Sequence, residues 1–273
     1  MRRRAVTGAL YATPLAVLVG MFFVVPLLLV VWMSLHRWPL LGSPRFTAPD
    51  NYTAIAGNDL VVSAAWFTAR YTVLITALLF VIAFGLALLV QNRRPGVGFF
   101  RTAFFLPMTV GFASASLLFL GLLSDEIGAL PAGGDSPALG SAVTLVLWRF
   151  AGFNMLILLT GLQAIPLDVY EAARIDGASR WQVFGRITVP LMRPTIALVL
   201  TMMVTGSLLA FDQFWILTRG GPDNSTTSLV MVIYREAFVR LDLGSAAGLS
   251  VVLLVLLAAV GSVQFAVLRR RSA

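Results

Sequence analysis

Six apolar stretches, each long enough to cross a lipid bilayer as a helix, constrain this chain of 273 residues more than any other feature. A helix rises 1.5 Å per residue, so about 20 residues cross the ~30 Å hydrocarbon layer. The composition agrees, because 59% of the residues are hydrophobic and 12% are charged, whereas about a quarter of a soluble domain is charged. The sequence therefore predicts an all-α integral membrane protein, a single domain over residues 1–273 with six transmembrane helices. The predicted spans lie at about residues 9–35, 71–90, 103–123, 139–163, 196–217 and 246–268.

The arginines predict the orientation of the chain, because positively charged flanks resist translocation and stay in the cytoplasm. With six spans, both termini lie on the same side of the membrane. If that side is the cytoplasm, the cytoplasmic face carries 13 arginines against three acids, Asp168, Glu171 and Asp176. We therefore expect a multi-pass protein of the plasma (cytoplasmic) membrane with both termini cytoplasmic. The basic residues stand at the ends of spans, so the pI of about 11.1 follows from topology and indicates no nucleic-acid partner. The 13 arginines are Arg2, Arg3, Arg4, Arg93, Arg94, Arg101, Arg174, Arg180, Arg186, Arg193, Arg269, Arg270 and Arg271.

Missing residue types exclude several kinds of chemistry. The chain has no cysteine and all 20 basic residues are arginine, so it has neither a thiolate nor the lysine of a phosphate-binding loop. The one histidine, His36, stands beside Arg37 and Trp38 where the first span ends, which favours an interfacial role over a metal ligand. The sequence thus predicts no catalytic residue, no metal site and no cofactor in this chain. Any ATP that drives it must be hydrolysed by another subunit.

A polar segment between the fourth and fifth spans, residues 164–195, predicts two short helices joined by a tight turn. Asp168 stands three residues before Glu171, an acidic form of the capping box that begins a helix. Asp176 and Gly177 supply a helix-ending turn in which glycine takes a positive φ. The first helix also offers a small apolar surface that another protein can approach closely, made by Ala172, Ala173 and Ile175.

The second helix of this segment begins at a capping box formed by Ser179 and Gln182. Trp181, Phe184 and Ile187 recur at a spacing of three and predict one apolar stripe. Two interpretations remain open from these residues alone. The segment is either a rigid elbow on which a cytosolic partner docks, or an amphipathic linker whose aromatic side chains rest in the headgroup layer.

The order of residues in this segment resembles the EAA motif of ABC importer permeases. Other strings agree with the carbohydrate-type, first-subunit (MalF/UgpA-like) branch of these binding-protein-dependent inner-membrane components, such as residues 100–107, 161–166 and 217–222. The sequence departs from the branch in the loop over residues 124–137, which is short and lacks the usual asparagine-containing turn. The positions that match the EAA motif are Glu171, Ala172, Ala173, Asp176, Gly177, Ala178, Phe184, Ile187 and Pro190.

The resemblance implies a type I ABC importer permease fold in which residues 164–195 are the coupling helices. These matched residues, with Trp181 beside them, would contact a dimer of ABC ATPase subunits, which binds the ATP and Mg²⁺. The resemblance also implies a second permease subunit, either a different chain or another copy, and an extracytoplasmic solute-binding protein. Gly220, Gly221 and Pro222 belong either to an external docking loop for that binding protein or to an inert connector. After them Ser225, Thr226 and Thr227 are expected to cap a surface helix over residues 229–239. The implied solute is a sugar, an oligosaccharide or a related polyol such as a glycerophosphate.

Polar residues within the spans are candidates for the solute path, because charged groups in a bilayer are costly and usually face a cavity or a partner. Arg149 and Asp212 lie at depths that a long arginine side chain can bridge, so one interpretation is an ion pair that fastens two helices. The other is that polar groups bond solute hydroxyls while neighbouring rings stack on the C–H faces of a sugar. The candidate residues are Arg149, Asn154, Phe211, Asp212, Gln213 and Trp215.

Two other classes of protein were compared with this interpretation. A secondary transporter driven by an ion gradient normally has a midplane ionisable site, interrupted helices and two related halves, and the sequence shows no internal repeat. An integral-membrane enzyme needs a set of acids, histidines or metal ligands near one interface, and one histidine with scattered acids does not supply it. The non-catalytic permease is therefore the favoured interpretation.

Overall fold

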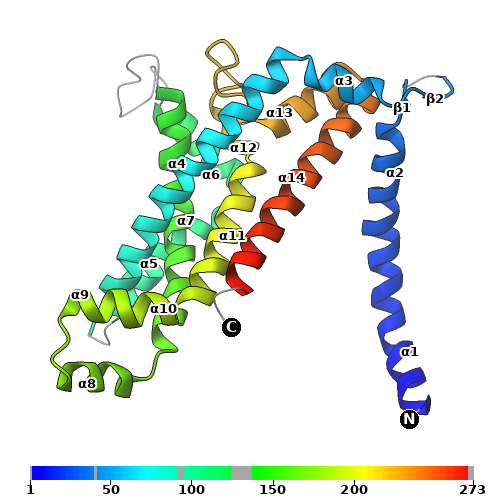
Figure 1. Ribbon diagram of the computed structural model, residues 1–273. Helices are drawn as coiled ribbons and strands as arrows, with labels where there is room; N and C mark the ends of the chain where they lie inside the picture. The colour runs from blue at the N-terminus through cyan, green and yellow to red at the C-terminus, as the bar shows by residue number, and fades with distance from the viewer. Residues whose placement is uncertain (1, 40–41, 92–94, 124–136, 270–273) are drawn as a thin grey trace. The chain divides into compact units, whose positions relative to one another are not determined.

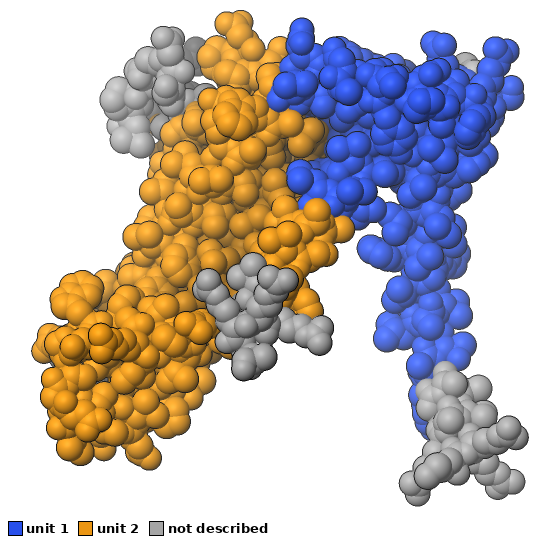
Figure 2. Space-filling view, in the orientation of Figure 1, with its two compact units in different colours: residues 1–62, 232–256 blue, residues 63–231, 257–273 orange. Residues whose placement is uncertain are grey.

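The computed structural model describes residues 2–39, 42–91, 95–123 and 137–269, and these residues are mainly helical (Figure 1). The chain divides into two compact units (Figure 2), one made by residues 1–62 with 232–256 and the other by residues 63–231 with 257–273. Most of the short loop over residues 124–137 lies outside the described residues, so its departure from the carbohydrate branch stays a prediction.

The first unit begins with an apolar helix and continues into a small hairpin. Strands β1 and β2 pair antiparallel, with His36 opposite Phe46. The side chain of Asn51 donates hydrogen bonds to the carbonyl oxygens of Ser34 and His36, so the start of α3 is tied to the end of the first span. The elements up to this point are α1 (Arg2–Val19), the π-helix η1 (Gly20–Val24), α2 (Val25–Ser34), β1 (His36–Arg37), β2 (Arg45–Phe46) and α3 (Asp50–Ala56).

The second unit contains most of the remaining helices. Its bundle is made by α4 (Asp59–Val90), α5 (Val97–Thr109), α6 (Phe112–Leu123), α7 (Pro137–Gln163), α11 (Arg193–Leu208) and α12 (Asp212–Leu217). Between α7 and α11 lie α8 (Leu167–Ile175), α9 (Arg180–Val183), the π-helix η2 (Phe184–Thr188) and α10 (Val189–Leu191). The chain ends with α13 (Leu229–Tyr234), the π-helix η3 (Arg235–Val239) and α14 (Leu243–Arg269), and the unit boundaries fall within α4, α13 and α14.

The predicted all-α fold is confirmed. The helix of the predicted second span starts at Asp59 rather than near residue 71, and the third and fifth spans are not continuous helices. Within the part of the chain that the structure describes, five apolar helical segments are long enough to cross a membrane: Tyr11–Ser34, Asp59–Val90, Leu139–Gln163, Arg193–Leu217 and Leu243–Ala266. The expected straight span over residues 103–123 is instead a pair of helices, Val97–Thr109 and Phe112–Leu122, bent by 93°. Hydropathy does not register a bend, because the residues on both sides of it are equally apolar.

The core of the second unit holds α4, α7 and α11 together. Ala83 and Ala87 of α4 are fully buried, as are Met155 and Leu158 of α7 and Val199 of α11. The helices α5 and α7 also approach closely, since a Cβ on Gly152 would collide with the backbone carbonyl of Phe104. This packing fixes the frame around the site described next.

Candidate functional site

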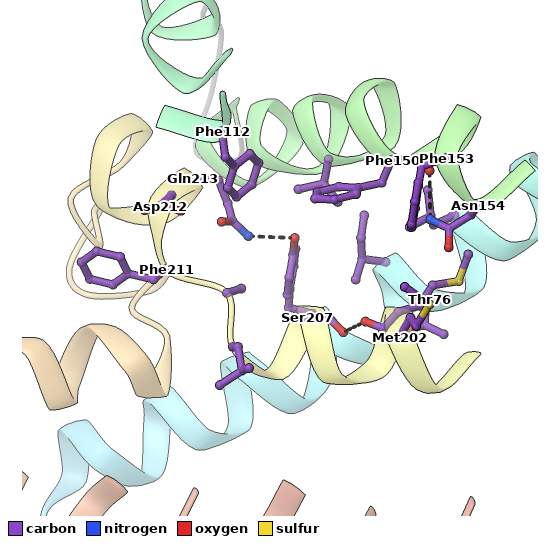
Figure 3. A pocket seen from close by; sticks show the side chains of 18 residues that line it. Thr76, Phe112, Phe150, Phe153, Asn154, Met202, Ser207, Phe211, Asp212 and Gln213 are labelled. Atoms are coloured by element: carbon purple, nitrogen blue, oxygen red, sulfur yellow. Dashed lines mark hydrogen bonds between the residues drawn. The ribbon is translucent and has the colours of Figure 1, made fainter. Parts of the chain in front are cut away.

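A cavity of about 280 Å³ lies within the second unit. It is enclosed by α4, the start of α6, the middle of α7, the end of α11 and the start of α12. In the view of Figure 3, Gln213 and Phe112 lie toward one end and Asn154 and Met202 toward the other. The lining is mostly aromatic and aliphatic with a few polar groups, which is typical of small-molecule sites.

Polar groups in the cavity wall keep hydrogen-bonding capacity free. Nε2 of Gln213 donates to the hydroxyl oxygen of Tyr71 over 3.2 Å, while Oε1 of Gln213 and Oγ1 of Thr76 are buried without a partner. Asn154 donates through Nδ2 to the carbonyl of Phe150 over 2.9 Å, and the carboxylate of Asp212 is half-buried. A buried polar atom without a partner costs free energy, so these oxygens favour a ligand that brings hydroxyl donors.

Aromatic rings make up much of the remaining wall. Phe112 and Phe150 meet edge to face with ring centroids 5.8 Å apart, and Phe211 stacks on Trp215 at 5.7 Å. Four of the six residues predicted for the solute path line the cavity, namely Asn154, Phe211, Asp212 and Gln213. Arg149 and Trp215 do not line it but contact rings that do.

Arg149 does not form the ion pair with Asp212 that was one of the two interpretations left open by the sequence. Its Nη1 donates to the carbonyl oxygen of Val110, at the bend between α5 and α6. Among the described residues, no ion pair within 4.0 Å joins it to Asp212. The partner of Arg149 is therefore a backbone group 39 residues away in sequence, which no pattern in the sequence indicates.

The fifth span is interrupted at residues 209–211, between α11 and α12. The carbonyl oxygen of Ala210, freed by the interruption, accepts a 2.6 Å hydrogen bond from Oγ of Ser228. Sequence reasoning missed Ser228, and it also missed Tyr71 and Thr76 as lining residues. The spacing of Tyr71 and Thr76 along α4 gives no signal for a shared face, because same-face neighbours on a helix are three or four residues apart.

The loop that contains Gly220, Gly221 and Pro222 is ordered by hydrogen bonds within itself. Oγ1 of Thr226 donates to Oγ1 of Thr218 over 2.7 Å and to the carbonyl oxygen of Gly221 over 2.8 Å. The expected cap at Ser225–Thr227 is wrong, because Oγ of Ser228 accepts from the amide of Met231 and so caps α13. Nor is α13 a surface helix, since Met231 and Val232 are fully buried.

The elbow at residues 164–195 has the predicted turn and one of the two predicted caps. Gly177 has φ of +73°, and its amide donates to the carbonyl of Arg174 while the amide of Ala178 donates to that of Ala173. These two bonds form a Schellman motif, which ends α8. Ser179 and Gln182 form the reciprocal capping box that begins α9. The cap predicted at Asp168 is wrong, because the N-cap position of α8 is Pro166, two residues earlier, and it has no side-chain cap.

The elbow has an exposed side and an anchored side (Figure 1). Ile175 and Trp181 are 86% and 84% exposed, and Glu171, Ala172, Asp176 and Gly177 are also exposed. Ala173 is buried, and the ring of Phe184 meets that of Phe84 edge to face at 5.8 Å. The expected single stripe of Trp181, Phe184 and Ile187 is therefore wrong, because Trp181 is exposed whereas Phe184 packs on Phe84. Ile187 and Pro190 are half-buried.

A bundle of apolar helices around a partly polar cavity, with an exposed elbow at one end of the same unit, defines a multi-pass membrane transport protein. The model of the family described as "binding-protein-dependent transport system inner membrane component" matches residues 80–273, and the chain belongs to this family. It has the type I ABC importer permease fold.

Relatives match almost the whole chain. The sn-glycerol-3-phosphate transport system permease protein UgpA of Agrobacterium fabrum is 32% identical over 282 residues, with 96% of this chain and 94% of that protein covered. The sulfoquinovosyl glycerol transport system permease protein SmoG of the same organism is 30% identical, with 97% and 91% covered. A solved bacterial ABC transporter for the import of the acidic polysaccharide alginate contains a chain of the same fold. That chain has a TM-score of 0.82 and 22% identity, with 96% of this chain and 95% of that chain covered.

Proposed function

We propose that this chain is one of two permease subunits of an ATP-driven importer for a sugar, an oligosaccharide or a related polyol such as a glycerophosphate. The observation that carries the substrate class is the cavity, where free oxygens of Gln213 and Thr76 lie among aromatic rings. Hydroxyl groups both donate and accept hydrogen bonds, and sugar C–H faces pack on rings. The names of UgpA and SmoG, both transporters of glycerol derivatives, support the same class.

The interrupted helices call for comparison with an ion-driven secondary transporter, which also uses such helices. In this chain Arg149 bonds to the interruption at residues 110–111, and Ser228 bonds to the interruption at residues 209–211. The sequence shows no internal repeat, whereas a secondary transporter normally has two related halves. Family membership over residues 80–273 favours the importer.

The elbow would transmit the movement of the ATPase to the helix bundle. Its exposed Ile175 and Trp181 offer apolar area, while the partly buried Phe184 packs the same segment against the core. A dimer of ATPase subunits would bind the ATP and Mg²⁺, and this chain would do no chemistry. Both termini and the elbow would be cytoplasmic, whereas the loop with Gly220, Gly221 and Pro222 would receive an extracytoplasmic solute-binding protein.

The first test is to purify the chain from its own host in mild detergent and identify the proteins that come with it by mass spectrometry. The proposal expects an ATPase, a second six-span protein and an exported binding protein, whose ligand then names the solute. Repeated recovery of the chain alone would contradict the importer and favour an ion-driven carrier.

A second test addresses coupling through the elbow. Glu171→Lys and Gly177→Asp should abolish uptake while the protein still inserts into the membrane, because both change the surface offered to the ATPase. Asp168→Lys is the matched control, since it makes a comparable charge change at an exposed position of the same helix. Unchanged uptake by the Glu171 and Gly177 variants would remove the coupling assignment.

A further inference from the structure

We propose that Arg149 is a positioning residue that holds the bend between α5 and α6 and thereby places Phe112 in the wall of the cavity. The helix α5 ends at Val110, whose ψ of 130° turns the chain out of the helix. The carbonyl of Val110 therefore has no helical partner in the next turn. Nη1 of Arg149 donates to this carbonyl from α7.

The position of the guanidinium explains why a charged side chain is retained within a span. Arg149 is 8% exposed, and a buried cation in a membrane is costly unless it is compensated. Its Cζ lies 5.1 Å from the ring centroid of Phe112 and 5.3 Å from that of Phe150, distances at which cation–π attraction is effective. One cation thus contacts the bend and two rings that line the cavity.

Two other causes of the bend are present in the sequence. Pro107 lies within α5 and Gly111 follows its end, and both weaken a helix. They permit a break but do not select its angle. The contact from α7 supplies a second fixed point for the α5–α6 pair, so the angle of 93° depends on Arg149.

The decisive measurement is the distance between spin labels on the two arms of the bend. The chain has no cysteine, so cysteines introduced at Phe99 and Leu122, which are 73% and 48% exposed, are the only labelled sites. At 1.5 Å per residue, the two positions lie about 24 Å apart through space when the helix pair is bent and about 35 Å apart when it is straight. Electron–electron dipolar spectroscopy of the purified full chain in lipid nanodiscs resolves the difference.

Arg149→Met should shift the distance distribution toward the longer value, and Arg149→Lys, which keeps a charged donor, should restore the shorter one at least in part. Asp212→Asn is the matched control for an ion pair and should leave the distribution unchanged. A distribution unaffected by Arg149→Met would overturn the proposal. An identical shift with Asp212→Asn would also overturn it, because electrostatic pairing would then hold the bend. If Arg149→Met does not elute as a single species, Arg149→Gln takes its place.

The expected effect on transport rests on the proposed function, whereas the expected change in the spin-label distance does not. In the complete importer, Arg149→Met should raise the apparent KM for the solute by roughly tenfold, about what one misplaced aromatic contact from Phe112 is worth, with a smaller change in kcat. If Arg149→Met lengthens the spin-label distance but the importer with Arg149 unchanged transports none of these solutes, only the proposed function is contradicted. A longer distance with an unchanged KM would show that the bend does not shape the cavity.

Discussion

Gly152 shows how a single residue sets the packing of two spans. It lies on α7 where the backbone of α5 passes, and an added Cβ would meet the carbonyl of Phe104 rather than a side chain that can move. Gly152→Ala should therefore destabilise the protein by about 1–3 kcal/mol, the usual cost of overpacking. The measurement is the thermal transition of the purified chain in detergent.

The control for that prediction lies on the same helix. Gly140 has no atom within 4 Å of an added Cβ, so Gly140→Ala should be neutral or slightly stabilising, because alanine favours a helix by up to about 1 kcal/mol over glycine. Equal behaviour of the two variants would mean that α5 and α7 are not in close contact at Gly152.

At the scale of elements, the turn between α8 and α9 depends on one left-handed residue. Gly177 has φ of +73°, a conformation that costs other residues about 1–2 kcal/mol. Gly177→Ala should loosen the Schellman motif and speed hydrogen exchange at the amides of Gly177 and Ala178, which now bond to α8. Gly185→Ala is the comparison, because Gly185 lies nearby in η2, has no positive φ and meets no atom within 4 Å of an added Cβ. Faster exchange in both variants would show that the elbow is generally mobile.

At the scale of the whole molecule, the sequence predicted what is encoded locally and missed what depends on contacts between distant segments. Hydropathy predicted the spans, and the spacing of Ser179 and Gln182 predicted a cap, because each pattern is complete within one element. The bond from Ser228 to Ala210 joins residues 18 apart, across an interruption that no local signal marks. The cavity residues Asn154, Asp212 and Gln213 were predicted because polar groups are rare in spans, whereas Tyr71 and Thr76 were missed because they lie on a span that reads as uniformly apolar.

The orientation of the whole chain follows from its arginines and can be tested directly, because the chain has no cysteine. The exposed positions Ile175 in the elbow and Ser225 in the loop after α12 accept single cysteines without loss of a buried contact. Positively charged flanks are retained in the cytoplasm, so we expect a membrane-impermeant maleimide to label Ser225→Cys in intact spheroplasts. Ile175→Cys should react only in inverted vesicles or after the membrane is opened. The reverse pattern would place the elbow outside, where no ATPase can reach it. Labelling of both positions from one side would mean that the two positions lie on the same side of the membrane, so that no single span separates them.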